Sequence, residues 1–540
     1  MSFGSSSSVQ SPNILKNVVD ERFDTLADMI VSNIKVGRTV KTCGYNTKDD
    51  GGAAEYRIVS PVAVDGYGDH LLSNGNAALL VIKDGEINAK QYGMVFDGVT
   101  NDYAACAALE AVVAASYYDV FFPEGVLELG ANSFPFRNAV VPPVSFKDYG
   151  GARLYGAGFG KTVIRTTSAA GKDVLQVNGV KNLSIKALSV TAVLTGSGGS
   201  GSNGLSVTHG AENLDIDIEV YSAPGLDKTS FMDGGKAFTL QSLNTTVLPF
   251  KNVKIRGRAK DCVYGFGIDA PYEAFNINSG VGISGIDVDV IVEDCWRGCV
   301  LSAPAATASI TELEKDSDVR VNMTCINVAQ PLISARWVGG DINVHVANTK
   351  LKADLFRPFA ADLAVYGAYV VGVFSHSVNV SGKMRECDNK LIIGAASQAF
   401  SVFTGSKNLN LNFSAAAESV VSGNDLLVLN VGGNVATNSN IVLAGITDTT
   451  YIDLLEVAGT LKPQWQNTIV LQAKKFIQDA NIQKLIVEKQ GAAYNAFEVD
   501  AVTGLVSLPR LASGSAGVAD GYITIKDSFS GADYKIQLYT

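Results

Sequence analysis

The central part of the chain repeats a short phrase of strictly alternating apolar and polar positions, which in most copies begins with Asn or Asp. Alternation with a period of two predicts a β-strand with one buried face. Nine copies begin at Asn182, Asn213, Asn252, Ile286, Asp318, Asp341, Ser377, Asn408 and Asn440. Successive starts lie 23 to 39 residues apart. A strand-forming repeat of this length predicts a solenoid, which presents a long groove.

A second apolar segment follows several copies of the phrase, at residues 264–270, 297–303, 330–335, 355–360 and 390–395. Aligning these segments places Cys262, Cys295, Val328 and Cys387 in one column. Such a column predicts an inward-facing ladder in which cysteine acts as a small apolar filler. The seven cysteines form no C-x-x-C pair and the four histidines are scattered. We therefore expect no metal site and no organic cofactor.

The flanking regions follow other patterns. Residues 1–12 are rich in serine, and residues 13–35 carry apolar positions at helical spacing, so this part predicts a flexible start and an amphipathic helix. Residues 36–86 alternate short strands with Gly-rich turns and predict a β-rich neck. Residues 87–460 predict the solenoid, opened by a strand over 87–93 and an Ala-rich helix over 103–115. The tail, 461–540, loses the repeat and predicts a separate β-domain that caps the solenoid.

The composition and charge of the chain restrict the classes of partner that it can bind. The chain has 540 residues, 54 of them glycine, and a net charge of −10. An acidic chain is a poor partner for nucleic acid, because phosphate contacts need Lys and Arg. The most apolar window, 104–122, is interrupted by Glu110 and Asp119, so we expect no membrane span.

The region 36–165 carries motifs that resemble a known superfamily. They are Asp97-Gly98-Val99-Thr100-Asn101-Asp102, the Ala-rich helix, Phe121-Phe122-Pro123-Glu124-Gly125, and the Gly-rich stretch 154–164. Together they resemble the first coils of pectate-lyase-like right-handed parallel β-helix proteins, which include bacteriophage tailspikes. Met94-Val95-Phe96 departs from the usual small residues and indicates a local packing change. One of Thr100, Asn101 and Asp102 is expected to cap the helix.

The resemblance implies an all-β, intertwined homotrimer on the phage tail, with a C-terminal domain that trimerises the shaft. It also implies attachment to the virion or to another tail protein through residues 1–35, and capsular polysaccharide or O-antigen as the ligand. The stretch 156–162 ends in Gly-Lys-Thr, as a phosphate-binding loop does. It lacks the first glycine of that motif, because residue 155 is Tyr, so a turn of the β-helix is favoured.

Acidic residues stand beside the cysteine column. Asp261, Asp294, Asn327 and Glu386 align in one column, with Glu293 and Arg385 in the column before it. Neighbouring rungs lie about 4.8 Å apart, so carboxylates here approach the separations of paired glycosidase acids. The catalytic candidates are Asp261, Asp269, Glu273, Glu293 and Asp294. The candidates for substrate binding, as aromatic platforms and carboxylate-pairing arginines, are Tyr272, Trp296, Arg297, Arg336 and Trp337.

These features predict a tailspike that depolymerises a bacterial surface polysaccharide by hydrolysis with paired carboxylates. One alternative is a polysaccharide lyase, in which Arg297, Arg336 or Lys260 would neutralise a uronic-acid carboxylate. Another is a receptor-binding tail fibre without activity. For any single carboxylate, capping of exposed backbone amides at a solenoid turn is the competing explanation.

Overall fold

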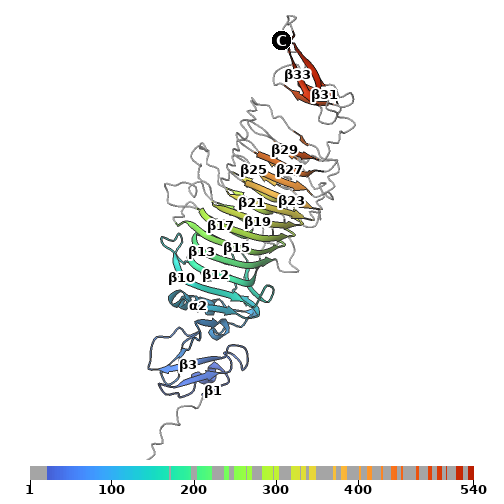
Figure 1. Cartoon of the computed structure of the whole chain (residues 1–540). Coiled ribbons are helices and arrows are strands. Elements are labelled where there is room, and N and C mark those ends of the chain that lie inside the picture. The colour runs from blue at the N-terminus through green and yellow to red at the C-terminus, as the bar shows by residue number, and fades with distance from the viewer. Residues whose placement is uncertain are drawn as a thin grey trace, which may run out of the picture. The chain divides into compact units, whose positions relative to one another are not determined.

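The computed structural model describes residues 21–169, 172–195, 203–221, 236–241, 248–262, 264–269, 283–295, 297–302, 318–328, 330–335 and 340–347, and strand segments between residues 369 and 539. Contacts divide the chain into two units, Met1–Gln472 and Ala473–Thr540. Strands dominate both units (Figure 1). Among the described residues, no helix has the length and apolar character that crossing a membrane requires.

A small sheet forms the first part of the larger unit. Its strands are β1 (Glu21–Phe23), β2 (Thr39–Thr42), β3 (Ala54–Val59), β4 (His70–Leu71) and β5 (Ala77–Leu80), in the order β1-β2-β3-β5-β4. β1 pairs with β2 in parallel, and the other neighbours are antiparallel. Met29, Val40 and Tyr56 are buried in the core of this sheet. The sheet occupies the region predicted as a β-rich neck but begins at Glu21, before residue 36.

The amphipathic helix predicted over residues 13–35 is replaced, from residue 21 onward, by β1 and the short helix α1 (Leu26–Ile30). Thr25 caps α1, because its hydroxyl accepts the Asp28 N–H and the Asp28 carboxylate accepts the Thr25 N–H. Leu26 and Met29 are buried in the neck core. The apolar spacing was therefore a correct sign of burial, but pairing of β1 with β2 takes residues 21–23 out of the helix.

The first coils of the solenoid contain the motif-bearing segments. They are β6 (Glu86–Asn88), the 3-10 helix η1 (Ala89–Tyr92), β7 (Asp97–Asn101), α2 (Tyr103–Ser116), β8 (Asp119–Phe122), β9 (Gly125–Glu128), β10 (Lys147–Gly156) and β11 (Thr162–Ser168). The predicted helix is confirmed. The strand expected over 87–93 ends at Asn88, because the Asn88 side chain accepts the Lys90 N–H and starts η1.

Asp102 occupies the N-cap position of α2 but makes no side-chain cap hydrogen bond, and the Asn101 side-chain oxygen accepts the Tyr103 N–H at 3.0 Å. The Asp102 carboxylate instead accepts the N–H groups of Val95 and Phe96. Met94 and Phe96 are buried, in agreement with a packing change at this position. The Gly-Lys-Thr stretch joins β10 to β11 as a turn, in which the Thr162 hydroxyl accepts the Ala157 N–H at 2.8 Å. A strand follows it, where a phosphate-binding loop would require a helix.

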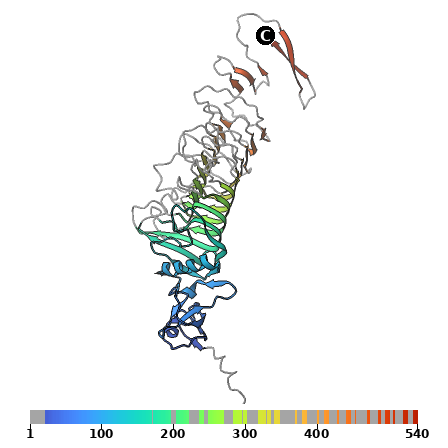
Figure 2. The same ribbon diagram turned by 90° about the vertical axis from the view of Figure 1, so that its left-hand side faces the viewer.

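All nine repeated phrases contribute residues to strands of one parallel stack. These strands are β12 (Leu175–Leu194), β13 (Leu205–Tyr221), β15 (Phe250–Lys260), β17 (Ile283–Glu293), β19 (Val319–Ile326), β21 (Asp341–Ala347), β23 (Asn379–Arg385), β25 (Asn410–Ala415) and β27 (Asn440–Ile446). Each pairs in parallel with the next. Figures 1 and 2 show the successive coils. The predicted right-handed parallel β-helix is confirmed.

A second stack runs beside the first. It contains β14 (Lys236–Gln241), β16 (Tyr264–Asp269), β18 (Arg297–Ser302), β20 (Gln330–Ala335), β22 (Tyr369–Val371), β24 (Phe400–Val402), β26 (Leu427–Leu429) and β28 (Ile452–Asp453). The predicted pairing of 264–270, 297–303 and 330–335 is confirmed. The next two coils differ, because β20 pairs with Tyr369–Val371 and not with 355–360, and β22 pairs with Phe400–Val402 and not with 390–395.

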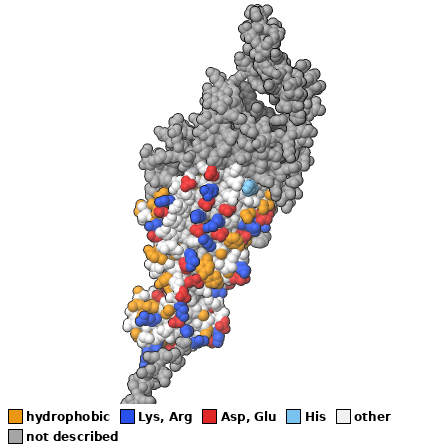
Figure 3. Space-filling model, in the orientation of Figure 1, with side chains coloured by type: hydrophobic (Ala, Val, Ile, Leu, Met, Phe, Trp, Pro, Cys, Tyr) orange, Lys and Arg blue, Asp and Glu red, His pale blue; other side chains and the backbone are white. Residues whose placement is uncertain are grey.

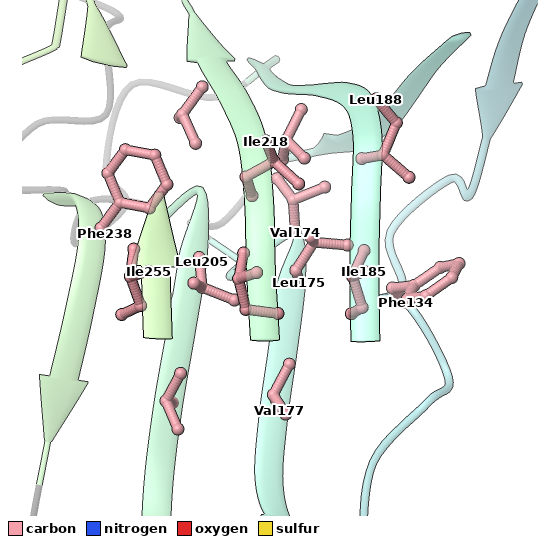
Figure 4. Packing of buried hydrophobic residues seen from close by; sticks show 14 of the residues in the cluster. Phe134, Val174, Leu175, Val177, Ile185, Leu188, Leu205, Ile218, Phe238 and Ile255 are labelled. Atoms are coloured by element: carbon pink, nitrogen blue, oxygen red, sulfur yellow. The ribbon is translucent and has the colours of Figure 1, made fainter. Parts of the chain in front are cut away.

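Apolar ladders fill the interior of the coils. In Figure 4, Ile185 and Leu188 of β12, Leu205 and Ile218 of β13 and Ile255 of β15 pack together. Cys262, Cys295 and Val328 are buried in the predicted column, and the Cys262 N–H lies 3.4 Å from Cys295 Sγ. Burial raises the pKa of the Cys295 thiol well above its ordinary value. The ladder is confirmed for these three residues, and Cys387 lies outside the described residues.

The second unit holds two small sheets. β30 (Lys484–Glu488), β31 (Asn495–Asp500) and β32 (Val506–Ser507) form an antiparallel sheet, and β33 (Ala519–Lys526) pairs with β34 (Asp533–Tyr539) as a hairpin. β29 (Val470–Ala473) spans the boundary between the units. A separate β-structure was expected for this region; trimerisation through it stays a prediction.

Candidate functional site

The outward side chains of the first stack form a regular grid, called here the outer face. From Leu214 of β13 and its aligned residues Val253, Ile286 and Val319 onward, inward residues alternate with residues that point outward. Strand pairing aligns them in four columns. The outward residues are Asp215, Asp217, Glu219 and Tyr221 on β13, and Lys254, Arg256, Arg258 and Lys260 on β15. They are Asp287, Asp289, Ile291 and Glu293 on β17, and Arg320, Asn322, Thr324 and Ile326 on β19.

Charge alternates over three neighbouring rungs of the outer face, β13, β15 and β17. The outward positions of β15 are all basic, whereas those of β13 and β17 are mostly acidic. Figure 3 shows Lys and Arg interspersed with Asp and Glu on the described part of the molecule. Opposite charges in directly paired strands attract, and like charges would repel. The order of charges therefore stabilises the observed register.

Asp215 is the most strongly engaged of these acids. Its two carboxylate oxygens contact Lys186 Nζ at 2.6 Å and Arg256 Nη2 at 2.8 Å. Burial opposes ionisation of Asp215, but the hydrogen bonds from Lys186 and Arg256 outweigh it and lower its pKa. Arg256 also lies in the field of Asp217 and Asp287. Asp215 is therefore an anchor of the outer face, with its charge already matched.

An open groove of about 550 Å³ crosses the start of these strands. Its lining includes Asn213, Asp215, Asn252, Lys254, Gly285, Asp287, Asp318 and Arg320. Asp287 and Asp318 stand one rung and two residues apart, which places their backbone positions roughly 8 Å from each other. The Asp318 carboxylate reaches back to the neighbouring rung, where it accepts the Gly285 N–H at 3.1 Å. Three carboxylates, Asp215, Asp287 and Asp318, and two cations, Lys254 and Arg320, thus share one groove.

An asparagine ladder forms the rim of this groove. Asn182, Asn213 and Asn252 have φ values of 56°, 52° and 54°, in the left-handed region that asparagine tolerates. The side-chain amide of Asn213 donates to Asn182 at 2.9 Å, and that of Asn252 donates to Asn213 at 3.0 Å. Gly285 occupies the same corner of the next coil, at φ 64°. The Asn at the head of the repeated phrase is therefore a corner residue.

The acidic column predicted from the sequence lies at the opposite end of the same strands. Asp261, Asp294 and Asn327 each follow a strand at φ 54° to 55°. Their N–H groups donate to carbonyls of the next coil at 3.0 to 3.1 Å, and the Asn327 amide donates to Asp294 Oδ1 at 2.5 Å. The alignment is confirmed for these three residues, and Glu386 lies outside the described residues. The left-handed corner alone accounts for Asp or Asn at these positions.

The other predicted site residues divide into three groups. Glu293 ends β17 on the outer face, with its Oε1 3.8 Å from Lys260 Nζ. Asp269 ends β16 in the second stack, about 17 Å of strand beyond Tyr264, so the fold separates it from Asp261. Arg297 begins β18 in the second stack, where its backbone is aligned with Tyr264 and Gln330. Glu273, Tyr272, Trp296, Arg336 and Trp337 lie outside the described residues.

The groove residues Asp215, Lys254, Asp287 and Arg320 were missed by the sequence analysis. Each directly follows the first apolar residue of a repeated phrase, so aligning the phrases on that apolar residue places all four in one column. The cysteine column and the acidic column beside it lie at the other end of the strands. Across the described residues, no cluster of three His, Cys, Asp or Glu side chains is arranged to hold a metal ion. The expectation of no cofactor stays a prediction.

Comparison with known proteins found likeness in structure alone. No protein-family model matches the chain, and no curated protein matches it. Similar solved structures include the tailspike gp49 of Acinetobacter baumannii phage Fri1, described as a capsular polysaccharide depolymerase (12% identity, 83% of this chain and 78% of that chain, TM-score 0.38). Others are the A. baumannii phage AM24 tailspike (12%, 80% and 62%, 0.41) and Pantoea stewartii WceF, described as a glycan biofilm modifying enzyme (11%, 79% and 48%, 0.38). The chain is thus similar in structure to phage tailspikes with a parallel β-helix.

Proposed function

We propose that this chain is a phage tailspike that binds a bacterial capsular polysaccharide or O-antigen and depolymerises it by glycosidic hydrolysis. The groove on the outer face is the observation that carries the proposal, because it is open, polar and continuous with a surface of stacked rungs. A polymer can lie along such a surface, whereas a small ligand would need an enclosed pocket. The motifs of residues 97–164 support the same class of protein. The solved tailspike from phage Fri1 is described as acting on a capsular polysaccharide.

Asp287 and Asp318 are the carboxylate pair that we propose for the chemistry. Their backbone positions lie roughly 8 Å apart on neighbouring rungs. We propose that their carboxyl groups take the separation of an inverting pair, roughly 6.5–9.5 Å, which leaves room for a water molecule. Asp318, oriented by the Gly285 N–H, activates the water, and Asp287 protonates the leaving oxygen. Lys254 and Arg320 bind polar or anionic substituents of the sugar. No metal or organic cofactor takes part in this mechanism.

The carboxylates predicted from the sequence form a competing group. Asp261, Glu293 and Asp294 lie at the other end of the strands, while Asp269 and Glu273 belong to the second stack and its following segment. Corner geometry explains Asp261 and Asp294 without catalysis. Substituting these five carboxylates, and separately Asp287 and Asp318, therefore shows which of the two sets carries the catalysis.

The test is a depolymerisation assay on an array of purified capsules and O-antigens, read by size-exclusion chromatography. We expect wild-type protein to shorten one of them, and Asp287→Asn and Asp318→Asn to lower the rate at least a hundredfold, the effect of losing a general acid or base. Glu212→Gln, on β13 but outside the groove, is the matched control. Asp261→Asn, Asp269→Asn, Glu273→Gln, Glu293→Gln and Asp294→Asn complete the set. Full activity of both groove variants would overturn the assignment of Asp287 and Asp318.

The same assay distinguishes the alternatives. A lyase would release products with the ultraviolet absorbance of a conjugated double bond, and Lys254 and Arg320 would then neutralise the uronic-acid carboxylate. A receptor-binding fibre would bind a polysaccharide and leave its length unchanged. Either result would contradict hydrolysis while keeping the polysaccharide as ligand.

We also propose that the protein is a homotrimer on the virion, acting at the bacterial surface, with the tail domain 461–540 holding the trimer and residues 1–35 docking to the phage tail or to another tail protein. Deleting residues 1–35 should leave a soluble trimer that no longer joins particles. Sedimentation of that deletion product as a monomer would contradict this division of roles.

A further inference from the structure

The columns of the outer face continue toward the first coils of the solenoid. Strand pairing aligns Asn88, Phe121, Tyr155 and Lys186 in one column, which leads on to Asp217 and Arg256. The neighbouring column contains Glu86, Asp119, Arg153 and Ser184, and leads to Asp215 of the groove. The groove and the first coils therefore share one uninterrupted face.

Two aromatic side chains stand next to each other on this face. Val120 and Phe122, on either side of Phe121, are fully buried, so Phe121 points outward. Tyr155 of the next coil is its direct partner, with ring centroids 5.4 Å apart and ring planes inclined by 41°. Both rings are partly exposed. Phe121 and Tyr155, called here the aromatic platform, thus present ring surface to solvent. The same column continues with the charged residues Lys186, Asp217 and Arg256.

The groups beside the aromatic platform are already paired. The Tyr155 hydroxyl donates to the Glu86 carboxylate. Arg153 donates to Asp119 from its backbone N–H and its Nε, both at 2.8 Å. Because these bonds hold Tyr155 and neutralise Arg153, the aromatic platform offers an uncharged surface with a polar border. Such a surface suits the apolar face of a pyranose ring, whose hydroxyls meet the border.

We propose that the aromatic platform is a stacking subsite for a sugar of the same polysaccharide, an inference that rests on the proposed function. Tyr155 lies three rungs from Lys254, a distance of about 14 Å along the solenoid axis. A polymer that fills both sites runs parallel to the axis, across the strands. The aromatic platform then binds long chains and contributes nothing to fragments too short to span both sites.

The experiment compares binding and turnover on the polysaccharide that wild-type protein shortens in the array. Phe121→Leu and Tyr155→Leu keep apolar bulk for folding but remove the flat rings. We expect roughly tenfold weaker binding of the intact polymer, which corresponds to about 1.4 kcal/mol. KM should rise while kcat is retained, because the rings act far from the carboxylates. Tyr155→Phe, which loses the bond to Glu86 but keeps the ring, should bind as wild type does. Phe159→Leu, at an exposed aromatic in the turn after β10, is the control.

The outcomes separate the subsite from the proposed function. Wild-type affinity and KM in both leucine variants would overturn the subsite and leave the hydrolase intact. A change in sedimentation in place of a change in binding would also overturn it, since the aromatic platform would then be a contact between copies of the chain. If wild-type protein binds nothing in the array, the proposed function fails and the subsite fails with it.

Discussion

The hydroxyl of Tyr149 donates a 2.5 Å hydrogen bond to the Glu110 carboxylate and so joins β10 to the helix α2. Lys147 Nζ contacts the same carboxylate oxygen at 2.5 Å. Tyr149 and Glu110 are both buried. α2 also buries Cys106, Leu109 and Val113 in the core. This polar contact therefore fixes the helix on the apolar coils beneath it.

Replacing Tyr149 with Phe should destabilise the first coils. The variant leaves a buried carboxylate oxygen without one of its donors, which costs roughly 1–3 kcal/mol. Amide hydrogen exchange in α2 should quicken accordingly, and Tyr103→Phe, on the same helix, serves as the control. Unchanged exchange in α2 would show that Lys147 alone holds Glu110.

The asparagine ladder predicts unequal effects of two substitutions at Asn213. Asn213→Gly loses the amide bonds but keeps a residue suited to φ 52°, whereas Asn213→Ala loses the bonds and strains the corner. Alanine should cost about 1–2 kcal/mol more than glycine, the penalty for a left-handed residue with a Cβ. Thermal melting of the two variants compares them. A less stable glycine variant would mean that chain flexibility outweighs strain here.

The contribution of Asp215 to the free energy of unfolding should depend on pH. Its folded pKa is lowered, so the stabilisation is present above the unfolded value of about 3.9 and is lost as pH falls through the folded pKa. Asp215→Asn should lower the melting temperature at neutral pH by an amount worth up to about 1 kcal/mol, since the pair is partly exposed. The difference from wild type should vanish in strong acid and shrink in high salt. A constant difference across pH would contradict the role of Lys186 and Arg256.

The buried thiols should resist alkylation. Burial raises the pKa values of Cys106, Cys295, Cys299 and Cys325, which suppresses the reactive thiolate. Iodoacetamide labelling of native protein, mapped by mass spectrometry, should modify Cys43, which is partly exposed, before these four. Labelling of all sites should follow denaturation. Early modification of Cys295 would indicate that the coils open locally.

Much of the fold could be predicted because its main signal is local. Each phrase alternates over four or more residues, and burial of every second side chain follows from strand geometry. The buried column of Cys262, Cys295 and Val328 could be predicted for the same reason. The helix α1 was overpredicted because pairing of Glu21 with Val40 depends on a strand distant in sequence. Likewise, the strand that pairs with Gln330–Ala335 is Tyr369–Val371 and not the predicted segment 355–360. The spacing of the repeats does not reveal how many residues lie between paired strands.

The candidate site was harder to predict than the fold. Asp261 and Asp294 drew attention as carboxylates on adjacent rungs, but a left-handed corner selects Asp and Asn for reasons of backbone geometry. Asp269 is eight residues from Asp261, yet a complete strand separates them. Asp287 and Asp318 become neighbours only when two coils are aligned, which requires the register of β17 on β19.

The alternating charges of the outer face restrict how such a chain can lengthen. A duplication of one coil would set a basic rung against its own copy, and the like charges would repel. Duplicating an acidic coil together with the basic coil after it sets no like charges against each other at the new junction. Insertion of coils in pairs is therefore the route by which this surface can grow without losing its register.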